Sequence, residues 1–312
     1  MRVIEVQAPG LLTTVQDLGR EGFGPMGVSP SGAADAISLR LGNRLVDNPE
    51  SAAGLEMTLL GGAFAFPEHA VLSLAGSDFG ATLDGKPVEL WTAFEARPGQ
   101  VLRLGPTRSG ARCYLCVRGG LEVEQFLGSA STHLLSGLGG HEGRALRKGD
   151  VLYIGDANQA TRKARVTLGA VKSFAPCKVL RVTEGPQVAW FSEEAKKAFY
   201  ASAYRVAEES NRMGIRLQGA PIPAPAGGEM ISEGVSLGAV QVPEGGLPII
   251  LFVEQQTTGG YPKIANVISA DFHSLGQLRP RDEIRFERVD WETARALFIE
   301  QEKLLASEEL IV

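Results

Sequence analysis

The sequence predicts a mainly β protein with a few helices, on three observations. The 312 residues are 44% hydrophobic and 21% charged, which is an ordinary globular composition. The 38 glycines and 17 prolines mostly separate short apolar runs, a spacing typical of many short strands joined by turns. One turn-and-strand pattern also recurs three times. Barrels or sandwiches are therefore favoured over an alternating βαβ array.

The recurring pattern is a tight turn followed by an apolar strand. It occupies Arg97–Leu104, Arg147–Ile154 and Arg279–Phe286. Two copies in the first half and one near the end suggest that the two halves are related β-barrels.

Three segments have helical periodicity and plausible ends. The first covers residues 34–46. The second covers 193–209 and follows Ser192, a side chain suited to an N-cap. The third covers 291–306 and follows Asp290, which suits the same role.

The length fits two domains of about 150 residues each. The stretch Thr161–Pro176 is basic and poorly patterned, so we expect the boundary there. The predicted domains are residues 1–170 and 171–312.

Charge and cysteine usage exclude several classes of function. The net charge of −5 and the pI near 5.6 provide no basic field for nucleic acid or anionic membranes. The N-terminus lacks a signal-like apolar core, and no apolar run is long enough to span a membrane, so we expect a cytoplasmic protein. Cys113 and Cys116 form a CxxC on a predicted strand, where residues three apart point to opposite faces. With four histidines that lack metal-ligand spacing, we expect no metal site.

Four polar, glycine-rich segments interrupt the apolar strands. They are Thr13–Arg20 running on to Gly27–Asp35, Leu127–Thr132, Ser210–Leu217 and Glu254–Lys263. The last contains TTGGYPK, whose hydroxyls, backbone N–H groups and Lys263 suit an anion, although a plain hairpin fits the same letters. Arg212 and Arg216, four residues apart, form either a cationic clamp or two surface arginines. No Walker A spacing and no nucleophile elbow is present.

These segments, in order along nearly the whole chain, resemble the family of allophanate hydrolase subunit 2, whose members are also called KipI antagonist or the C subunit of 5-oxoprolinase. The matching stretches are TVQDLGR, GVSPSGAAD, LRLGNRLVDNPESAAGLEMTLLGG, LAGSDFGATLDGKPV, LGSAST, EGRALRKGD, SNRMGIRL and QTTGGYPKIANV. The resemblance implies two cyclophilin-like β-barrel domains. It also implies kinship with the carboxyltransferase region of urea carboxylase.

The activity implied by the resemblance is ATP-dependent cleavage of the 5-oxoproline lactam to glutamate. The assembled enzyme would use ATP with Mg, and this chain would act with a KipI-like B subunit and a separate A subunit. No Met-Lys-Met motif is present, so we expect no covalently attached biotin. Two alternatives stay open: a carboxyltransferase or amidolyase partner acting on urea-like amides, and a regulator that binds a KipI-like kinase inhibitor. The segment Ser29–Asp35 has no evident core role, and we expect it near the interface with a partner.

The resemblance and the chemistry together nominate site residues. Activating an amide by phosphorylation requires cations and N–H donors around phosphoryl oxygens. We assign catalytic roles to Lys263, Gln256 and Asp17, the last as a base or as a group that positions an arginine. The substrate- or phosphate-binding candidates are Arg20, Arg212, Arg216, Thr257, Thr258, Gly259, Gly260, Tyr261, Ser129 and Ser131. The chain departs from the family in having Glu254 for Asp, Ala130 for Arg and Arg281 for Gly.

Overall fold

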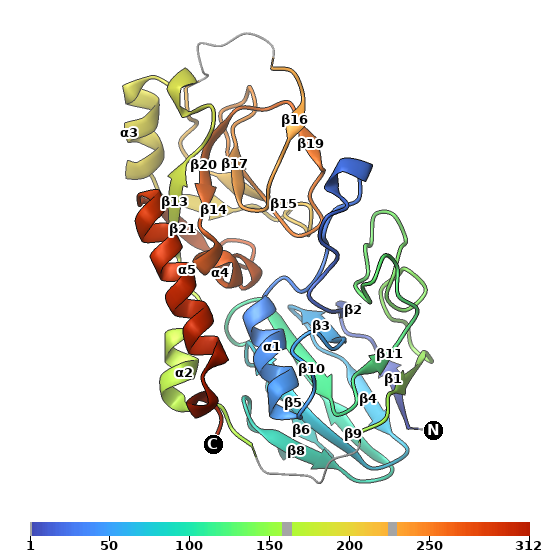
Figure 1. Cartoon of the computed structure of the whole chain (residues 1–312). Helices are drawn as coiled ribbons and strands as arrows, with labels where there is room; N and C mark the ends of the chain where they lie inside the picture. The colour runs from blue at the N-terminus through green and yellow to red at the C-terminus, as the bar shows by residue number, and fades with distance from the viewer. Residues whose placement is uncertain (1, 158–163, 224–229) are drawn as a thin grey trace. The chain divides into compact units, whose positions relative to one another are not determined.

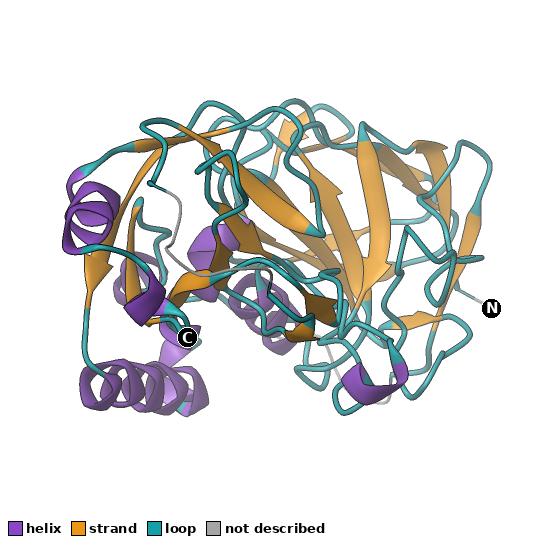
Figure 2. Cartoon of the chain, turned by 90° about the horizontal axis from the view of Figure 1, so that it is seen from above, coloured by secondary structure: helices purple, strands orange, loops and turns teal. Residues whose placement is uncertain are grey.

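The computed structural model describes residues 2–157, 164–223 and 230–312. The chain forms two compact units. Unit 1 comprises Met1–Arg20, Ser31–Ala175 and Ser307–Val312, and unit 2 comprises Glu21–Pro30 and Pro176–Ala306. Strands and loops predominate over helices, which confirms the mainly β prediction (Figures 1 and 2). The predicted domain boundary at residue 170 stays a prediction, because compact units need not be independently folding domains. Residues 161–163, which belong to the predicted boundary stretch, lie outside the described residues.

Unit 1 contains two antiparallel sheets. The seven-stranded sheet has the order β11-β12-β1-β4-β9-β6-β7, and the five-stranded sheet has the order β2-β3-β10-β5-β8. The strands of the first are β1 (Val3–Ala8), β4 (Ala63–Phe66), β6 (Thr82–Leu83), β7 (Lys86–Pro87), β9 (Gln100–Arg103), β11 (Leu121–Glu122) and β12 (Val151–Ile154). Those of the second are β2 (Leu12–Gln16), β3 (Gly54–Thr58), β5 (Ala70–Gly76), β8 (Ala93–Ala96) and β10 (Arg112–Val117).

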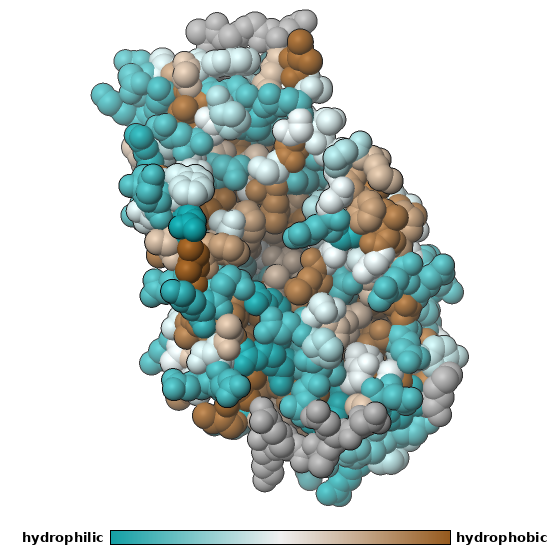
Figure 3. Space-filling view, viewed as in Figure 1, coloured by the Kyte–Doolittle hydropathy of each residue, from teal (hydrophilic) through white to brown (hydrophobic). Residues whose placement is uncertain are grey.

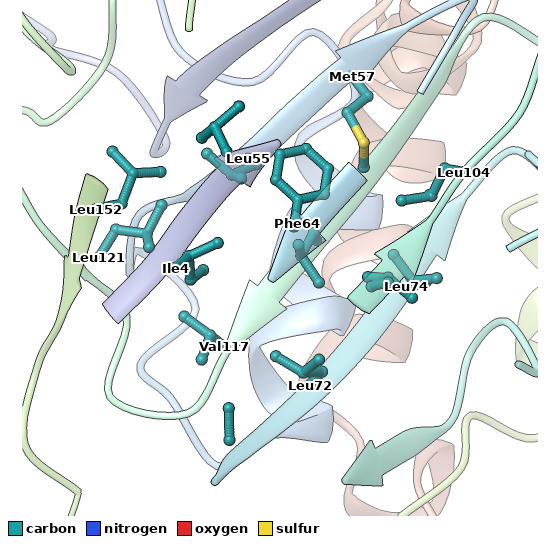
Figure 4. Packing of buried hydrophobic residues seen from close by; sticks show 14 of the residues in the cluster. Ile4, Leu55, Met57, Phe64, Leu72, Leu74, Leu104, Val117, Leu121 and Leu152 are labelled. Carbon is teal, nitrogen blue, oxygen red and sulfur yellow. The ribbon is translucent and has the colours of Figure 1, made fainter. Parts of the chain in front are cut away.

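The two sheets of unit 1 share one hydrophobic core. Ile4 and Phe64 of the first sheet and Leu55, Leu74 and Val117 of the second belong to the same buried cluster (Figure 4). Burying these side chains fully contributes about 1.5–3 kcal/mol each, before the cost of ordering the chain.

Helix α1 (Ala36–Leu45) covers the other face of the five-stranded sheet, packing on β5 and β10. Asp35 caps its start by accepting a hydrogen bond from Ser38 N at 3.0 Å. Cys113 belongs to the core between the sheets, whereas Cys116 belongs to the cluster beneath α1. The two thiols are free and on opposite faces of β10, as predicted.

Unit 2 is built on a closed barrel in the order β13-β20-β17-β18-β15-β14-β21. The β13–β21 pair is parallel, and the other described pairs of the barrel are antiparallel. Its strands are β13 (Val179–Glu184), β14 (Tyr204–Val206), β15 (Gly214–Gln218), β17 (Ala239–Gln241), β18 (Ile249–Leu251), β20 (Lys263–Val267) and β21 (Glu283–Arg288). A separate two-stranded ribbon pairs β16 (Glu233–Gly234) with β19 (Thr258–Gly259).

Of the two other predicted helices, one is confirmed and one is shorter than predicted. Helix α5 (Trp291–Ala306) matches its prediction. Helix α3 (Glu193–Ala201) begins after Ser192 as predicted. It ends eight residues before residue 209, so the predicted C-terminal end was wrong. Residues 204–206 form β14 instead. Tyr204 and Val206 are buried there and Arg205 is exposed, so the local period is two and pairing with β21 overrides helix propensity.

Several short helical turns were not predicted. They are α2 (Leu168–Ser173), α4 (Phe272–Gly276) and the 3₁₀ turns η1 (Gly24–Met26), η2 (Val188–Trp190), η3 (Ser269–Asp271) and η4 (Glu308–Leu310).

All three recurring turns share one local structure, which confirms the predicted turn-and-strand units. In each, the residue at the fourth position donates its backbone N–H to the carbonyl of the first: Gln100 to Arg97, Asp150 to Arg147 and Asp282 to Arg279. The side chain at that fourth position accepts the first residue's N–H in return, at 2.7–2.9 Å. The third position has a positive φ in every copy, which favours glycine. It is held by Gly99, Gly149 and Arg281.

Candidate functional site

The predicted site residues fall into two groups, one in each unit. Asp17, Arg20, Ser129 and Ser131 lie in unit 1, and the remaining candidates lie in unit 2.

In unit 1, Asp17 binds the loop that carries the two predicted serines. Its carboxylate accepts hydrogen bonds from Ser129 Oγ, Ser131 Oγ and Ala130 N, each at 2.6 Å, and from Gly19 N at 2.8 Å. The structure therefore brings Asp17, Ser129 and Ser131 together across 112–114 residues of sequence. Three of these donors are on Oδ1 and one is on Oδ2, and the side chain is buried. The geometry therefore suits a positioning carboxylate better than a base, which needs an acceptor site open to substrate.

Arg20 is bound by carbonyl groups of the same loop. Its Nε donates to Phe126 O at 3.2 Å, its Nη2 donates to Ser131 O, and its guanidinium carbon lies 5.5 Å from the centre of the Phe126 ring. Only 2% of its surface is exposed. Gly139 packs so closely here that a Cβ would lie 2.2 Å from Ser131 O and 2.9 Å from Arg20 Nη2. Arg20 thus stabilises the loop, and its predicted contact with phosphate stays a prediction.

The glycine-rich run 137–143 lines a cavity of ≈ 450 Å³, together with residues 122–126 and 151–153. Glu122, Glu124 and Glu142 contribute to its wall, whereas no Lys or Arg occurs among the described residues that line it. A wall with this charge does not suit a phosphate.

In unit 2, the TTGG segment forms one strand of the β16–β19 ribbon and brings a carboxylate to Lys263. Lys263 begins β20 and has a buried side chain. Its Nζ lies 2.6 Å from Glu233 Oε1, on the partner strand of the ribbon. Gln187 joins the pair, since its Nε2 donates to the same Glu233 oxygen at 2.9 Å and its Oε1 accepts from Lys263 N at 3.1 Å. The Lys263 ammonium and the Gln187 amide lower the pKa of Glu233 below its ordinary value.

A glutamine lies beside this ion pair on the neighbouring strand. Gln241 of β17 pairs with Lys263 of β20, at a shift in the ladder register between Val240 and Gln241. Gln241 is 2% exposed, and its Nε2 has no hydrogen-bond acceptor among the described residues. Gly259 adjoins it: a Cβ there would lie 2.5 Å from Gln241 Nε2 and 2.9 Å from Gln256 Nε2. We call Gln187, Glu233, Gln241, Gly259 and Lys263 the lysine cluster.

The other candidates of the ribbon segment are more open to solvent. Gln256, Thr258 and Tyr261 are exposed, while Thr257 and Gly260 are half-buried. Their hydroxyl and amide groups border the lysine cluster along the chain. Their proposed contacts with substrate stay predictions.

The two arginines of the predicted clamp have different environments. Arg212 is buried, and its Nε donates to Glu254 Oε1 in a buried ion pair. Arg216 lies on β15 with its side chain exposed. The structure therefore does not pair them as a clamp, because one guanidinium serves an internal carboxylate and the other faces solvent.

Several residues of the segment Ser29–Asp35 have structural roles, so the expectation that it has none was wrong. Asp35 caps α1, Ala33 packs in the cluster beneath that helix, and Ser31 Oγ donates to Thr132 O at 2.8 Å. A nearby partner interface stays a prediction.

Sequence reasoning missed Gln187, Glu233 and Gln241. Each is far from TTGGYPK along the chain and belongs to no polar run, so only the barrel ladder and the ribbon bring them to Lys263.

Thiol and metal chemistry find no support in the described parts of the chain. Burial raises the pKa of Cys116 to about 12 and raises that of Cys113 and Cys177 as well, which disfavours the reactive thiolate. The residues described include no group of three or more His, Cys, Asp and Glu placed to hold a metal ion.

None of the described helices has the length and apolar character needed to cross a bilayer. Hydrophilic side chains cover much of the face drawn in Figure 3.

Comparison with known proteins gives one family. The profile described as "Carboxyltransferase domain, subdomain A and B" matches residues 26–288. The C subunit of the Escherichia coli 5-oxoprolinase is 38% identical over 294 residues, which cover 94% of this chain and 93% of that protein. The urea amidolyase of Saccharomyces cerevisiae is 34% identical, but the match covers 97% of this chain and only 18% of that protein.

A solved structure supports the same relationship. The crystal structure of the Kluyveromyces lactis urea carboxylase superposes with a TM-score of 0.89 at 32% identity. The match covers 99% of this chain and 30% of the carboxylase. At this identity, the likeness extends to sequence as well as fold.

Proposed function

This chain belongs to the carboxyltransferase-domain family, with the C subunit of 5-oxoprolinase among its relatives, and we propose that it is the C subunit of an ATP-dependent 5-oxoprolinase. In this enzyme, the lactam of 5-oxoproline is opened to glutamate by the assembled subunits. The observation that carries the proposal is the match to bacterial C subunits over nearly the full length of both proteins.

The chemistry explains why a buried cation suits this reaction. A lactam carbonyl is a poor electrophile, and transferring a phosphoryl group from ATP to its oxygen creates a leaving group. Positive charge and N–H donors in a site screened from water stabilise the oxyanions involved. The lysine cluster offers such a set, because Lys263 is buried and Gln241 Nε2 has no acceptor among the described residues.

Within this proposal, Lys263 contacts an anionic oxygen of the phosphoryl group or of the substrate carboxylate. Gln256 and Thr257 orient the substrate or a water from the ribbon. The backbone N–H groups of Gly259 and Gly260 are further donors. Asp17 positions the Ser129–Ser131 loop through three donors, and Arg20 also holds this loop by donating to Ser131 O.

The proposed partners are a KipI-like B subunit in direct contact and an A subunit in the full enzyme, in the cytoplasm, with ATP and Mg used by the assembly. The test is glutamate release from 5-oxoproline and ATP, measured with the three subunits together and with each omitted in turn. We expect release only from the complete set and none from this chain alone. Glutamate release by the A and B subunits at the full rate without this chain would overturn the proposal.

A second candidate is a carboxyltransferase partner acting on urea-like amides, which the urea amidolyase and urea carboxylase relatives favour. This chain corresponds to a small part of those proteins, so the candidate needs further domains from other chains. Carboxylation of urea in the presence of a biotin carboxylase and a biotinylated carrier, without ATP-dependent lactam cleavage, would favour it.

A further inference from the structure

The lysine cluster contains two buried donors on neighbouring strands, and one carboxylate that reaches Lys263 from the surface. Gln241 and Lys263 are paired across β17 and β20 in the barrel. Lys263 is 3% exposed and Gln241 is 2% exposed. Such groups are buried only where they find partners or where a ligand supplies them.

Lys263 has a carboxylate partner that is itself open to water. The Glu233 side chain is 45% exposed, compared with 4% for the Lys263 side chain. No acceptor for the rest of the ammonium lies within hydrogen-bond reach among the described residues. Separating the pair would therefore cost Glu233 little free energy, since water can replace its contacts. The buried Lys263 ammonium would be left uncompensated unless another anion took the place of Glu233.

The strand that carries Glu233 is weakly held. In the described residues, the β16–β19 ribbon pairs Glu233 with Gly259 and Gly234 with Thr258, and one further hydrogen bond runs from Val235 N to Thr257 O at 3.1 Å. The ribbon forms a sheet separate from the barrel (Figure 1). Lys263 and Gln241 belong to the closed barrel itself. The donors are thus fixed and the carboxylate is on the more easily displaced element.

The Gln241 amide marks where a second oxygen of an anion would bind. Its Nε2 packs against the α-carbon of Gly259, where any Cβ would collide with it. An anion with two oxygens would take the place of the Glu233 carboxylate at Lys263 and also satisfy the unpaired amide. Gln187, whose Nε2 now donates to Glu233, would then be free to donate to the same anion.

We propose that Glu233 is an exchangeable counter-ion of Lys263, displaced by a ligand oxyanion that binds Lys263 Nζ and Gln241 Nε2. The ligand class is a carboxylate or a phosphoryl group, and its identification with 5-oxoproline or transferred phosphate rests on the proposed function. In the free protein, Glu233 neutralises the buried charge and keeps unwanted anions out. On binding, it moves to solvent.

The test uses the whole purified chain without partners, so that it is independent of turnover. Binding of inorganic phosphate and, separately, of 5-oxoproline is measured by calorimetry at constant ionic strength. Glu233→Gln keeps the shape but removes the competing charge, and we expect at least a five-fold lower Kd for one of the two ligands. Glu208→Gln is the matched control. It removes the same charge from an exposed pair with Arg281, and we expect wild-type affinity.

Gln241→Met tests the second donor. It removes the unpaired amide with little change in volume, so we expect at least five-fold weaker binding with no decrease in melting temperature. A purely structural amide would give the reverse, lower stability and unchanged binding. Unchanged or weaker ligand binding by Glu233→Gln would overturn the counter-ion proposal, and so would the absence of binding of either ligand to that variant. An equal decrease in Kd in Glu208→Gln would overturn it as well.

The two ligands separate the possible sources of the oxyanion. Tighter phosphate binding alone assigns a phosphoryl site, and tighter 5-oxoproline binding alone assigns a carboxylate site. Lactam cleavage by the wild-type assembly, together with unchanged binding in these variants, would retain the proposed function while rejecting the exchange.

Discussion

Arg212 and Glu254 are buried together as an ion pair, with 5% and 3% of their side chains exposed. Their backbones are linked as well, since Glu254 N donates to Arg212 O at 2.8 Å. A buried carboxylate that loses its cation becomes an uncompensated charge, which is far more costly than losing a surface pair. Arg212 is thus a structural cation, whatever further contact it makes.

Arg212→Ala should lower the free energy of unfolding by about 3–5 kcal/mol. Urea denaturation measures this loss, and Arg216→Ala is the control, because an exposed side chain should change stability by less than about 0.5 kcal/mol. Equal stability of the two variants would show that the Glu254 carboxylate does not depend on Arg212.

Asp17→Ala should loosen the loop that Asp17 binds. Four donors would lose their common acceptor, and hydrogen bonds to a charged group are worth about 1.5–3 kcal/mol. We expect faster hydrogen exchange at the Ala130 amide, with strands of the unit 2 barrel unchanged. Wild-type protection at Ala130 would contradict the positioning role.

Asp150 links stability to pH. The hydrogen bonds from the Arg144 guanidinium and from Arg147 N lower its pKa from 3.8 to about 2. Because the folded pKa is depressed, the stabilisation is complete above about pH 4 and is lost as the pH falls toward 2. Asp150→Asn should therefore cost about 2 kcal/mol at neutral pH. Denaturation curves should show this difference shrinking below pH 4, and a constant difference down to pH 2 would be contrary to expectation.

Arg281→Gly should stabilise the protein. Arg281 has a φ of 73° at the turn position where the two equivalent turns have glycine. A left-handed conformation costs a non-glycine residue about 1–2 kcal/mol, and the exposed Arg281–Glu208 pair contributes less than about 1 kcal/mol. A net gain of about 0.5 kcal/mol is expected in thermal denaturation.

The matched reverse change is Gly149→Ala. Apart from the two chain neighbours, no heavy atom of the described residues lies within 4 Å of a Cβ at Gly149. Only backbone strain should therefore act, and stability should fall by about 1 kcal/mol. Loss of stability in Arg281→Gly would show that the exposed pair outweighs the strain.

Local chemistry explains which features could be predicted from sequence. The three turns were predictable because their residues contact one another within four positions. The caps at Ser192 and Asp290 were predictable for the same reason. Strand β14 was missed because the burial of Tyr204 depends on pairing with β21, some 80 residues later. Tertiary contacts of that kind override local propensity.

The candidate site divides in the same way. Family resemblance nominated Asp17, Ser129, Ser131 and Lys263, and the structure supplies their contacts. Glu233 had no sequence signal, since it reaches Lys263 through a two-residue ribbon pairing. Gln241 Nε2 has no acceptor in the part of the chain that the structure describes. Its position depends on the register of β17 against β20, which no pattern in either strand specifies.

The most direct measurement is the ATP-dependent turnover of the assembled subunits with Lys263→Ala, beside Lys178→Ala as a control. Lys178 forms an ion pair with Asp282 at 2.8 Å and is largely exposed. A charge-assisted contact to an anion is worth about 1.5–3 kcal/mol, so its loss in the transition state lowers the rate by roughly ten- to hundred-fold. We predict that loss for Lys263→Ala with an unchanged melting temperature, and wild-type turnover for Lys178→Ala. Near-wild-type turnover in Lys263→Ala would contradict the assignment of the lysine cluster as the site.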